Sequence, residues 1–166
     1  GVGHPITAQP LVVGHPSGGH LIEFGTGKLS EVTDKVDLTL QTFYAIWDDA
    51  GNNSQVLKSS LQPQSITNER VINGDKYFTS STSSVNWLTQ KGWYLPLIYS
   101  GVATGERVIY PAQTTEGRVV FVTARVDATD PCQSSGSGRL VELDLTTGAM
   151  LDSPVLDTDN NGLLTD

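Results

Sequence analysis

The segment 105–150 contains three runs of β-branched and aromatic residues, and clusters of turn-forming residues separate them. The runs span residues 107–112, 118–126 and 139–145. Because a short turn and a longer turn join them, the segment predicts three strands in an antiparallel meander. Such a meander cannot bury both of its faces by itself. It needs a second sheet against it, as in a propeller blade or in one leaf of a sandwich.

The rest of the chain also predicts short strands joined by turns. The expected strands are 6–13, 20–24, 41–47, 61–72 (interrupted near Pro63), 76–80 and 92–98. Asn73-Gly74 is the strongest turn signal, because both residues of a type I′ turn need positive φ. Residues 31–37 predict a loop or a short helical turn. The sequence therefore predicts an all-β fold of antiparallel meanders, and its length suits a partial β-propeller of about two to three blades.

Composition and charge exclude several classes of protein. The formal net charge is −8, so phosphate would repel the chain, and we expect no nucleic-acid partner. No run approaches the roughly 18 apolar residues that a membrane-spanning helix needs, and the first residues do not have the charged stretch and apolar core expected of a signal peptide. Cys132 is the only cysteine, so no disulfide is possible within these residues. A free or structural cysteine is expected, and a bond to a cysteine elsewhere is the alternative.

The segment D-T-D-N-N-G-L-L-T-D at 157–166 is the sharpest chemical signal. Asp157, Asp159 and Asn161 occupy the first, third and fifth positions of a calcium loop, and Gly162 falls where such loops turn sharply. Asp166 follows at the tenth position. These four oxygen-bearing side chains are the predicted metal ligands, with Ca²⁺ as the predicted cofactor. The alternative is a solvated turn rich in Asn and Asp.

Other polar groups favour structural roles. The run Gly25-Thr26-Gly27-Lys28 lacks the spacing of a phosphate loop and predicts a turn at the end of a strand. We expect the histidines to be exposed in turns rather than to bind a metal; they are His4, His15 and His20. Nothing places any two of the carboxylates opposite one scissile bond; they are Glu23, Asp48 and Asp49. No nucleophile elbow is present, so we predict that the chain is not an enzyme.

Tryptophan and tyrosine residues could form a platform on which a sugar or a peptide stacks. The candidates are Trp47, Trp87, Trp93, Tyr44, Tyr94 and Tyr99. Aromatic residues in strands more often belong to the core, and that is the role we expect here.

Short motifs follow one another in order along nearly the whole chain. They are I-T-A-Q-P at 6–10, L-I-E-F-G-T-G-K at 21–28, Q-T-F-Y-A-I-W-D at 41–48, V-N-W and K-G-W-Y-L within 85–95, G-E-R-V at 105–108, and D-P-C, G-S-G-R-L-V-E-L-D and T-G within 130–148. Each motif alone is common. Their combination resembles the C-terminal β-propeller of the PilY/PilC family, the tip-associated adhesins and biogenesis factors of type IV pili.

The resemblance implies that residues 1–166 form a single β domain, part of a larger propeller in a protein at the bacterial cell surface, at the pilus tip or on the outer membrane. It implies support of pilus extension against retraction, and attachment to host or abiotic surfaces. Pilus tip and minor pilin proteins are the implied partners. The family's regulatory calcium loop, D-x-D-x-D-x-x-x-D, is expected upstream of Gly1. Residues 157–166 imitate it with Asn161 at the fifth position and Thr165 at the ninth.

Two alternatives stay open at this point. The run L-D-L-T-T-G-A at 143–149 is similar to blades of quinone-dependent dehydrogenases, and Trp87, Trp93 or Tyr94 would serve a carbohydrate-binding module. If the chain is part of a pilus protein, we expect its contact surface to be formed by loops 15–20, 48–54 and 127–138. Unpaired sheet edges also predict self-association.

Overall fold

Short strands, joined by turns and irregular loops, make up nearly all of what the computed structural model describes, which is residues 3–49, 51, 55–126, 136–155, 157 and 161–163. The strands are β1 Leu11–Gly14, β2 His20–Gly25, β3 Thr42–Asp48, β4 Gln62–Pro63, β5 Ile66–Ile72, β6 Asp75–Ser80, β7 Gly92–Pro96, β8 Ile98–Tyr99, β9 Val102–Ala103, β10 Gln113–Thr115, β11 Arg118–Val122, β12 Arg125–Val126, β13 Gly136–Ser137 and β14 Leu140–Asp144. The helical elements in these parts of the chain are two single 3₁₀ turns, η1 Val32–Lys35 and η2 Lys58–Ser60. The all-β prediction is confirmed.

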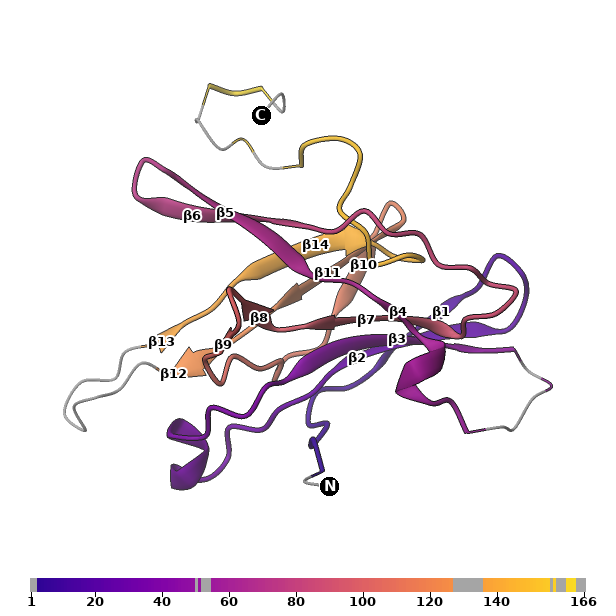
Figure 1. Cartoon of the computed structure of the whole chain (residues 1–166), viewed down its shortest axis with the longest axis horizontal. Helices are drawn as coiled ribbons and strands as arrows, with labels where there is room; N and C mark the ends of the chain where they lie inside the picture. Colours follow the sequence, from indigo (N-terminus) through magenta and orange to yellow (C-terminus); the bar gives the residue numbers. More distant parts are fainter. Residues whose placement is uncertain are drawn as a thin grey trace.

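The larger sheet has the strand order β1-β2-β3-β7-β4 (Figure 1). Its neighbours are antiparallel, except that β4 runs parallel to β7. β3 lies in the middle, as its aromatic residues on both faces predicted. Its residue Ala45 lies opposite Glu23 of β2 and Trp93 of β7. This register places side chains from three strands in one row on the inner face of the sheet.

A second sheet has the order β10-β11-β14, and the β12-β13 pair continues its long hairpin. Two further hairpins, β5-β6 and β8-β9, lie beside these sheets. In Figure 1 the β5-β6 hairpin lies across β14, on the side away from the larger sheet. The predicted meander is therefore confirmed in β11 and β14. The prediction of its first strand is wrong, because the partner of β11 is β10 and not residues 107–112.

Residues 107–112 do not form a strand because their backbone joins two sheets. Arg107 exchanges hydrogen bonds with Ala124, whereas the N–H of Val108 bonds to the carbonyl of Thr26 at 3.1 Å. Pro111 then offers no N–H for a ladder. The apolar run that resembles a strand in the sequence is thus a crossover, and Val108 is buried within it.

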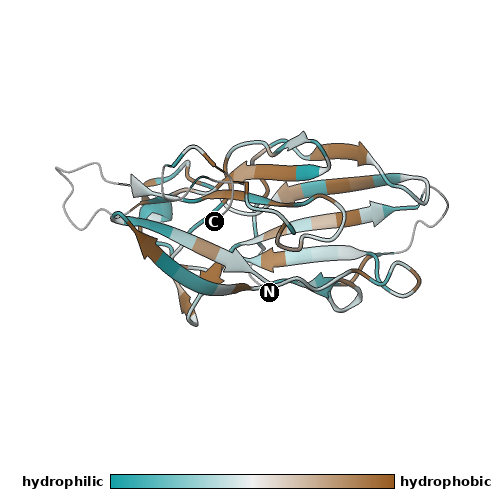
Figure 2. Ribbon diagram, turned by 90° about the horizontal axis from the view of Figure 1, so that it is seen from above, coloured by the Kyte–Doolittle hydropathy of each residue, from teal (hydrophilic) through white to brown (hydrophobic). Residues whose placement is uncertain are grey.

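The hydrophobic core lies between the two sheets. Phe43 of β3 stacks on Phe121 of β11 with ring centroids 4.0 Å apart, and on Trp93 at 5.7 Å. All three rings are almost completely buried. In Figure 2 the hydrophobic residues are concentrated along the strands, whereas the connecting loops are mostly neutral or hydrophilic. The apolar area hidden at this interface is the main stabilising contribution to the fold.

Two turns have the conformations that the sequence predicts. Asn73 and Gly74 have φ of 54° and 96°, as the predicted type I′ turn between β5 and β6 requires. The 3₁₀ turn η1 confirms the short helical turn predicted for residues 31–37. No helix in the described parts of the chain is long and apolar enough to cross a membrane.

Candidate functional site

Two of the predicted metal ligands, Asp157 and Asn161, lie among the described residues; Asp159 and Asp166 lie outside them. The Asp157 carboxylate accepts hydrogen bonds from the N–H of Asn161 at 3.1 Å and of Gly162 at 2.7 Å. Gly162 has a φ of 82°, which suits the sharp turn expected there. The first position of the loop therefore faces its fifth and sixth positions. The carboxylate oxygens of Asp157 and the side-chain amide oxygen of Asn161 are of the kind that calcium prefers.

Histidines do not gather into a metal site. Within the parts of the chain that can be described, no group of three or more His, Cys, Asp or Glu residues could hold a metal ion. His4 and His20 are exposed, as predicted. The same prediction is wrong for His15, which is only 6% exposed and stacks on Trp47 at 4.6 Å. The hairpin tip folds over the indole ring, and burial lowers the pKa of His15.

Glu23 is the strongest departure from the expected pattern. It points into the core and has no exposed surface. Neither carboxylate oxygen has a hydrogen-bond partner among the described residues. Burial, together with the nearby charge of Asp144, raises the pKa of Glu23 to about 8. The alternating pattern of β2 could have revealed this burial, because Leu21 and Glu23 must share a face.

The three carboxylates considered as a catalytic set are not brought together. Asp48 lies opposite His20 at the end of the β2–β3 ladder, whereas Glu23 lies opposite Ala45. Asp49 forms an ion pair with Lys91 at 2.8 Å. Each carboxylate thus has a different environment.

The aromatic residues divide between the core and the outer face of the larger sheet. Trp93 is fully buried, so it cannot stack on a sugar. Tyr44 and Tyr94 form a half-buried row with ring centroids 6.0 Å apart, and the Lys58 ammonium lies 4.4 Å from the Tyr94 centroid. The core role predicted for aromatics is therefore confirmed for Trp93, whereas Tyr44 and Tyr94 lie on the opposite face.

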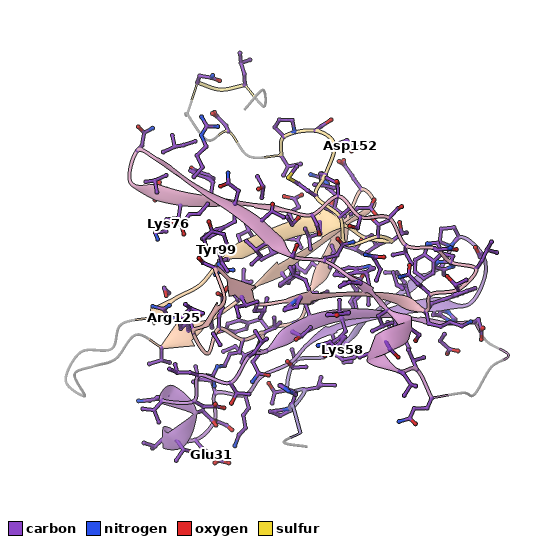
Figure 3. All side chains as sticks on the ribbon, in the orientation of Figure 1. Glu31, Lys58, Lys76, Tyr99, Arg125 and Asp152 are labelled. Carbon is purple, nitrogen blue, oxygen red and sulfur yellow. The ribbon has the colours of Figure 1, made fainter. Side chains whose placement is uncertain are left out.

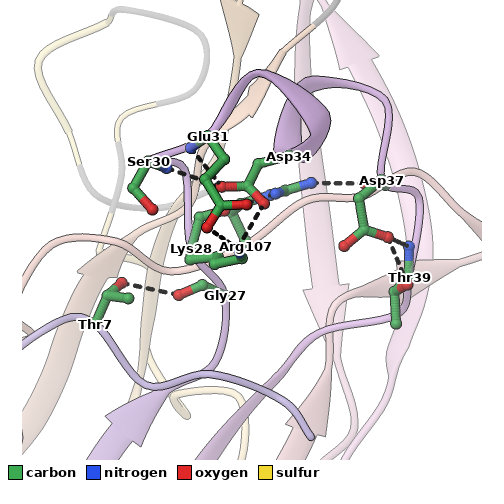
Figure 4. Close-up of polar contacts among 9 residues, drawn as sticks. All are labelled: Thr7, Gly27, Lys28, Ser30, Glu31, Asp34, Asp37, Thr39 and Arg107. Carbon is green, nitrogen blue, oxygen red and sulfur yellow. Dashed lines mark hydrogen bonds and ion pairs between the residues drawn. The ribbon is translucent and has the colours of Figure 1, made fainter. Parts of the chain in front are cut away.

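Arg107 organises the loop that contains the glycine-rich run (Figure 4). Its guanidinium is buried and donates to three carbonyls, those of Gly105, Lys28 and Asp37, at 2.7, 2.7 and 2.6 Å. Because buried donors must be satisfied, these bonds fix the loop between β2 and β3 against residues 105–107. The Gly25-to-Lys28 run is thus a structural turn, as predicted.

The predicted contact loops are only partly described. Residues 15–20 form the β1–β2 turn, where Gly18 accepts a hydrogen bond from Trp47 Nε1 at 2.8 Å. Most of 127–138, including Cys132, lies outside the described residues, as do residues 50 and 52–54.

Comparisons with known proteins relate the chain to pilus proteins. It is 31% identical over 157 residues to a type IV pilus biogenesis factor PilY1 homolog of Xylella fastidiosa, and 28% identical over 185 residues to PilY1 of Pseudomonas aeruginosa. These alignments cover 89% and 96% of this chain. A crystal structure of the P. aeruginosa PilY1 C-terminal domain matches 96% of the chain with a TM-score of 0.81 and 28% identity. None of the known protein-family models matches the chain.

The chain is short beside these relatives. It spans 10% and 16% of the two curated proteins and 35% of the solved domain. The alignments nevertheless extend over nearly all of this chain.

Proposed function

Because this chain belongs to the PilY/PilC family of type IV pilus biogenesis factors, we propose that it is a non-enzymatic β scaffold within an extracytoplasmic protein that supports pilus assembly. The similarity to PilY1 proteins over nearly the whole chain, in sequence and in fold, carries this proposal. The relatives are named as biogenesis factors, and this supports a structural rather than a catalytic role.

The fold suits a part that transmits force. The two sheets share one core, in which Phe43 and Phe121 stack in parallel. The Arg107 guanidinium ties the loop after β2 to the segment that crosses between the sheets. Displacing one sheet would therefore break core contacts and backbone hydrogen bonds together.

A hybrid protein tests the scaffold role. The matched part of the P. aeruginosa PilY1 C-terminal domain would be replaced by this chain in a strain that lacks PilY1. We expect surface pilin, measured after shearing, to recover from the level of the deletion strain. Absence of surface pili despite normal amounts of exported hybrid would contradict the proposal.

We further propose that the parent protein acts at the cell surface or pilus tip, limits pilus retraction, and attaches to host or abiotic surfaces together with tip and minor pilin proteins. The exposed residues 16–18 of the β1–β2 turn and the row of Tyr44, Tyr94 and Lys58 support a contact role. Attachment would be compared between strains of equal piliation, with and without substitution of Lys58 by Glu. Equal attachment would exclude this row as the contact surface.

Calcium binding by residues 157–166 is proposed as a separate property. The orientation of the Asp157 carboxylate toward residues 161 and 162 supports it. Calorimetric titration of the chain with Ca²⁺ should give a binding heat that Asp157→Ala removes and that Asp75→Ala, at the start of β6 and outside the loop, retains. A wild-type chain that gives no heat would contradict the proposal.

Self-association through the free edge of β1 is also proposed, because Val12 is 57% exposed on this edge strand. Exposed apolar edges pair with other strands, and a lysine there opposes pairing. Sedimentation should show concentration-dependent association that Val12→Lys weakens. A monomer at all concentrations would contradict this.

A further inference from the structure

The β5-β6 hairpin and β14 enclose a large groove, which we call the hairpin groove. It has a volume of about 1260 Å³, and its lining includes Phe78, Tyr99, Arg139, Val141, Leu143 and Met150. Figure 3 labels four of the lining residues: Lys76 of β6, Tyr99 of β8, Arg125 of β12, and Asp152 of the segment after β14. The lining includes neither the outer aromatic row nor residues 157–163, although it extends along the chain to Val155, shortly before Asp157.

One wall of the groove is the edge of β14 rather than one of its faces. Residues 140–143 all line it, yet consecutive side chains of a strand point to opposite faces. Only the edge of the strand can present all four to one space. The sheet order places β14 at the end of its sheet, with β11 on its other side.

The register shows which backbone groups of β14 face the groove. Leu145 donates to Gly117 and Arg139 accepts from Thr123, so the odd-numbered residues bond to β11. In an antiparallel ladder the alternate residues direct their N–H and C=O groups the other way. Asp144 uses its groups in the following turn. The backbone N–H and C=O groups of Leu140 and Glu142 have no partner in a neighbouring strand among the described residues.

The opposite wall is the β5-β6 hairpin. All of β6, Asp75–Ser80, lines the groove, and so do five of the residues of β5, which are Ile66, Asn68, Glu69, Arg70 and Ile72. Since a two-residue turn joins β5 to β6, Ile72 and Asp75 form the closing hydrogen-bonded pair. The backbone groups of Lys76 and Phe78 therefore face away from β5. The outer edge of β6 thus offers backbone hydrogen bonds, as the edge of β14 does.

Arg139 adds charge to this space. Its guanidinium pairs with Glu106 at 2.9 Å and lies 4.4 Å from the centre of the Phe78 ring. Its Nη1 is buried and has no hydrogen-bond partner among the described residues. A buried guanidinium nitrogen favours an anionic or carbonyl oxygen as a partner. An occupant with an acceptor at this end of the groove would satisfy it.

We propose that the hairpin groove accepts an extended segment of a partner protein as an added strand, with apolar side chains on alternate positions and an acidic group beside Arg139. Strand addition uses main-chain hydrogen bonds for affinity and side-chain pockets for selectivity. Apolar lining residues such as Leu143 and Tyr99 supply the pockets. This inference goes beyond the scaffold role and does not depend on it.

A synthetic peptide tests the groove directly. The probe is a short peptide of alternating valine and threonine that ends in aspartate, added to the full 166-residue chain. We expect calorimetry to detect binding, and hydrogen exchange of the Leu140 and Glu142 amides to slow when the peptide is present. A peptide N-methylated at alternate positions cannot pair with both edges and should bind at least about tenfold more weakly, the effect of losing about one hydrogen bond.

Substitutions at Leu140 provide the matched pair. Leu140→Pro removes a backbone N–H that points into the groove, whereas Leu140→Ala keeps it. The alanine variant loses little packing, because the Leu140 side chain is 58% exposed. We expect the proline variant to bind about tenfold more weakly and the alanine variant to bind as the wild type does. A circular dichroism spectrum identifies any variant that fails to fold, and in that case the N-methylated peptide decides.

Three results would overturn the proposal. The first is equal binding of the N-methylated peptide, and the second is peptide binding without protection of the two amides. The third is protection of the same amides by self-association of the chain alone, which would assign the groove to a second copy.

Discussion

Glu23 couples the ionisation of one side chain to folding. Its carboxyl group is fully buried, and burial and Asp144 raise its pKa from 4.5 to about 8. Between these values the folded chain holds a proton that the unfolded chain has lost. Its contribution to stability is therefore complete below pH 4.5 and is lost as the pH rises toward 8.

Glu23→Gln removes this ionisation and keeps the shape of the side chain. We expect its unfolding free energy, relative to the wild type, to rise by up to about 1.4 kcal/mol per pH unit across that interval and to level off outside it. Urea denaturation at several pH values measures the difference. Glu116→Gln, at an exposed carboxylate, is the control. A constant difference between Glu23→Gln and the wild type would show that Glu23 ionises alike in both states.

Gly148 shows how a single element is held against its neighbour. It follows β14, has a φ of 66°, and a Cβ on it would lie 2.3 Å from the Trp93 ring. The turn after β14 therefore packs on the larger sheet only because this residue has no side chain. Trp93 Nε1 also donates to the carbonyl of Leu145 at 3.3 Å.

Gly148→Ala should destabilise the chain by more than about 2 kcal/mol, because strain at positive φ adds to overpacking. Gly101→Ala is the matched control: its φ is 77°, but a Cβ there meets nothing within 4 Å. It should cost only the strain, about 1 kcal/mol. Thermal denaturation compares the two. Equal losses would mean that the turn moves away from Trp93 at little cost.

Local patterns in the sequence were sufficient for some elements. Asn73-Gly74 predicted its hairpin because the turn depends on the two residues themselves. The strand predicted at residues 107–112 is wrong because a crossover and a strand can have the same apolar composition. Only the backbone hydrogen-bond partners of Arg107 and Val108 distinguish the two. The order of the sheets depends on contacts between distant residues, which alternation along one strand does not specify.

The candidate surfaces were less predictable than the elements. The spacing of Asp157 and Asn161 predicts a calcium loop, and this stays a prediction. The burial of His15 depends on Trp47 and Trp87, which come from other parts of the chain. The hairpin groove has no sequence signal, because it arises where the β5-β6 hairpin and the edge of β14 meet in space.

At the scale of the whole molecule, one core joins the two sheets. Phe121 of β11 is 2% exposed and stacks on Phe43 of β3 with an angle of only 2° between the rings. Leu95 and Leu143 extend the same cluster from β7 and β14. A core shared in this way makes the folding of each sheet depend on the other, so the sheets should open together.

Phe121→Ala tests this coupling. The lost ring should lower the unfolding free energy by about 3–5 kcal/mol. Native-state hydrogen exchange should show the same loss for amides of β3 in the larger sheet as for amides of β11 in the smaller one. Tyr110→Ala, at a ring that is 57% exposed, should leave both nearly unchanged. If exchange accelerated in β11 while β3 kept its protection, the larger sheet would be stable alone, and a pulling force could then separate the sheets one after the other instead of meeting the resistance of both.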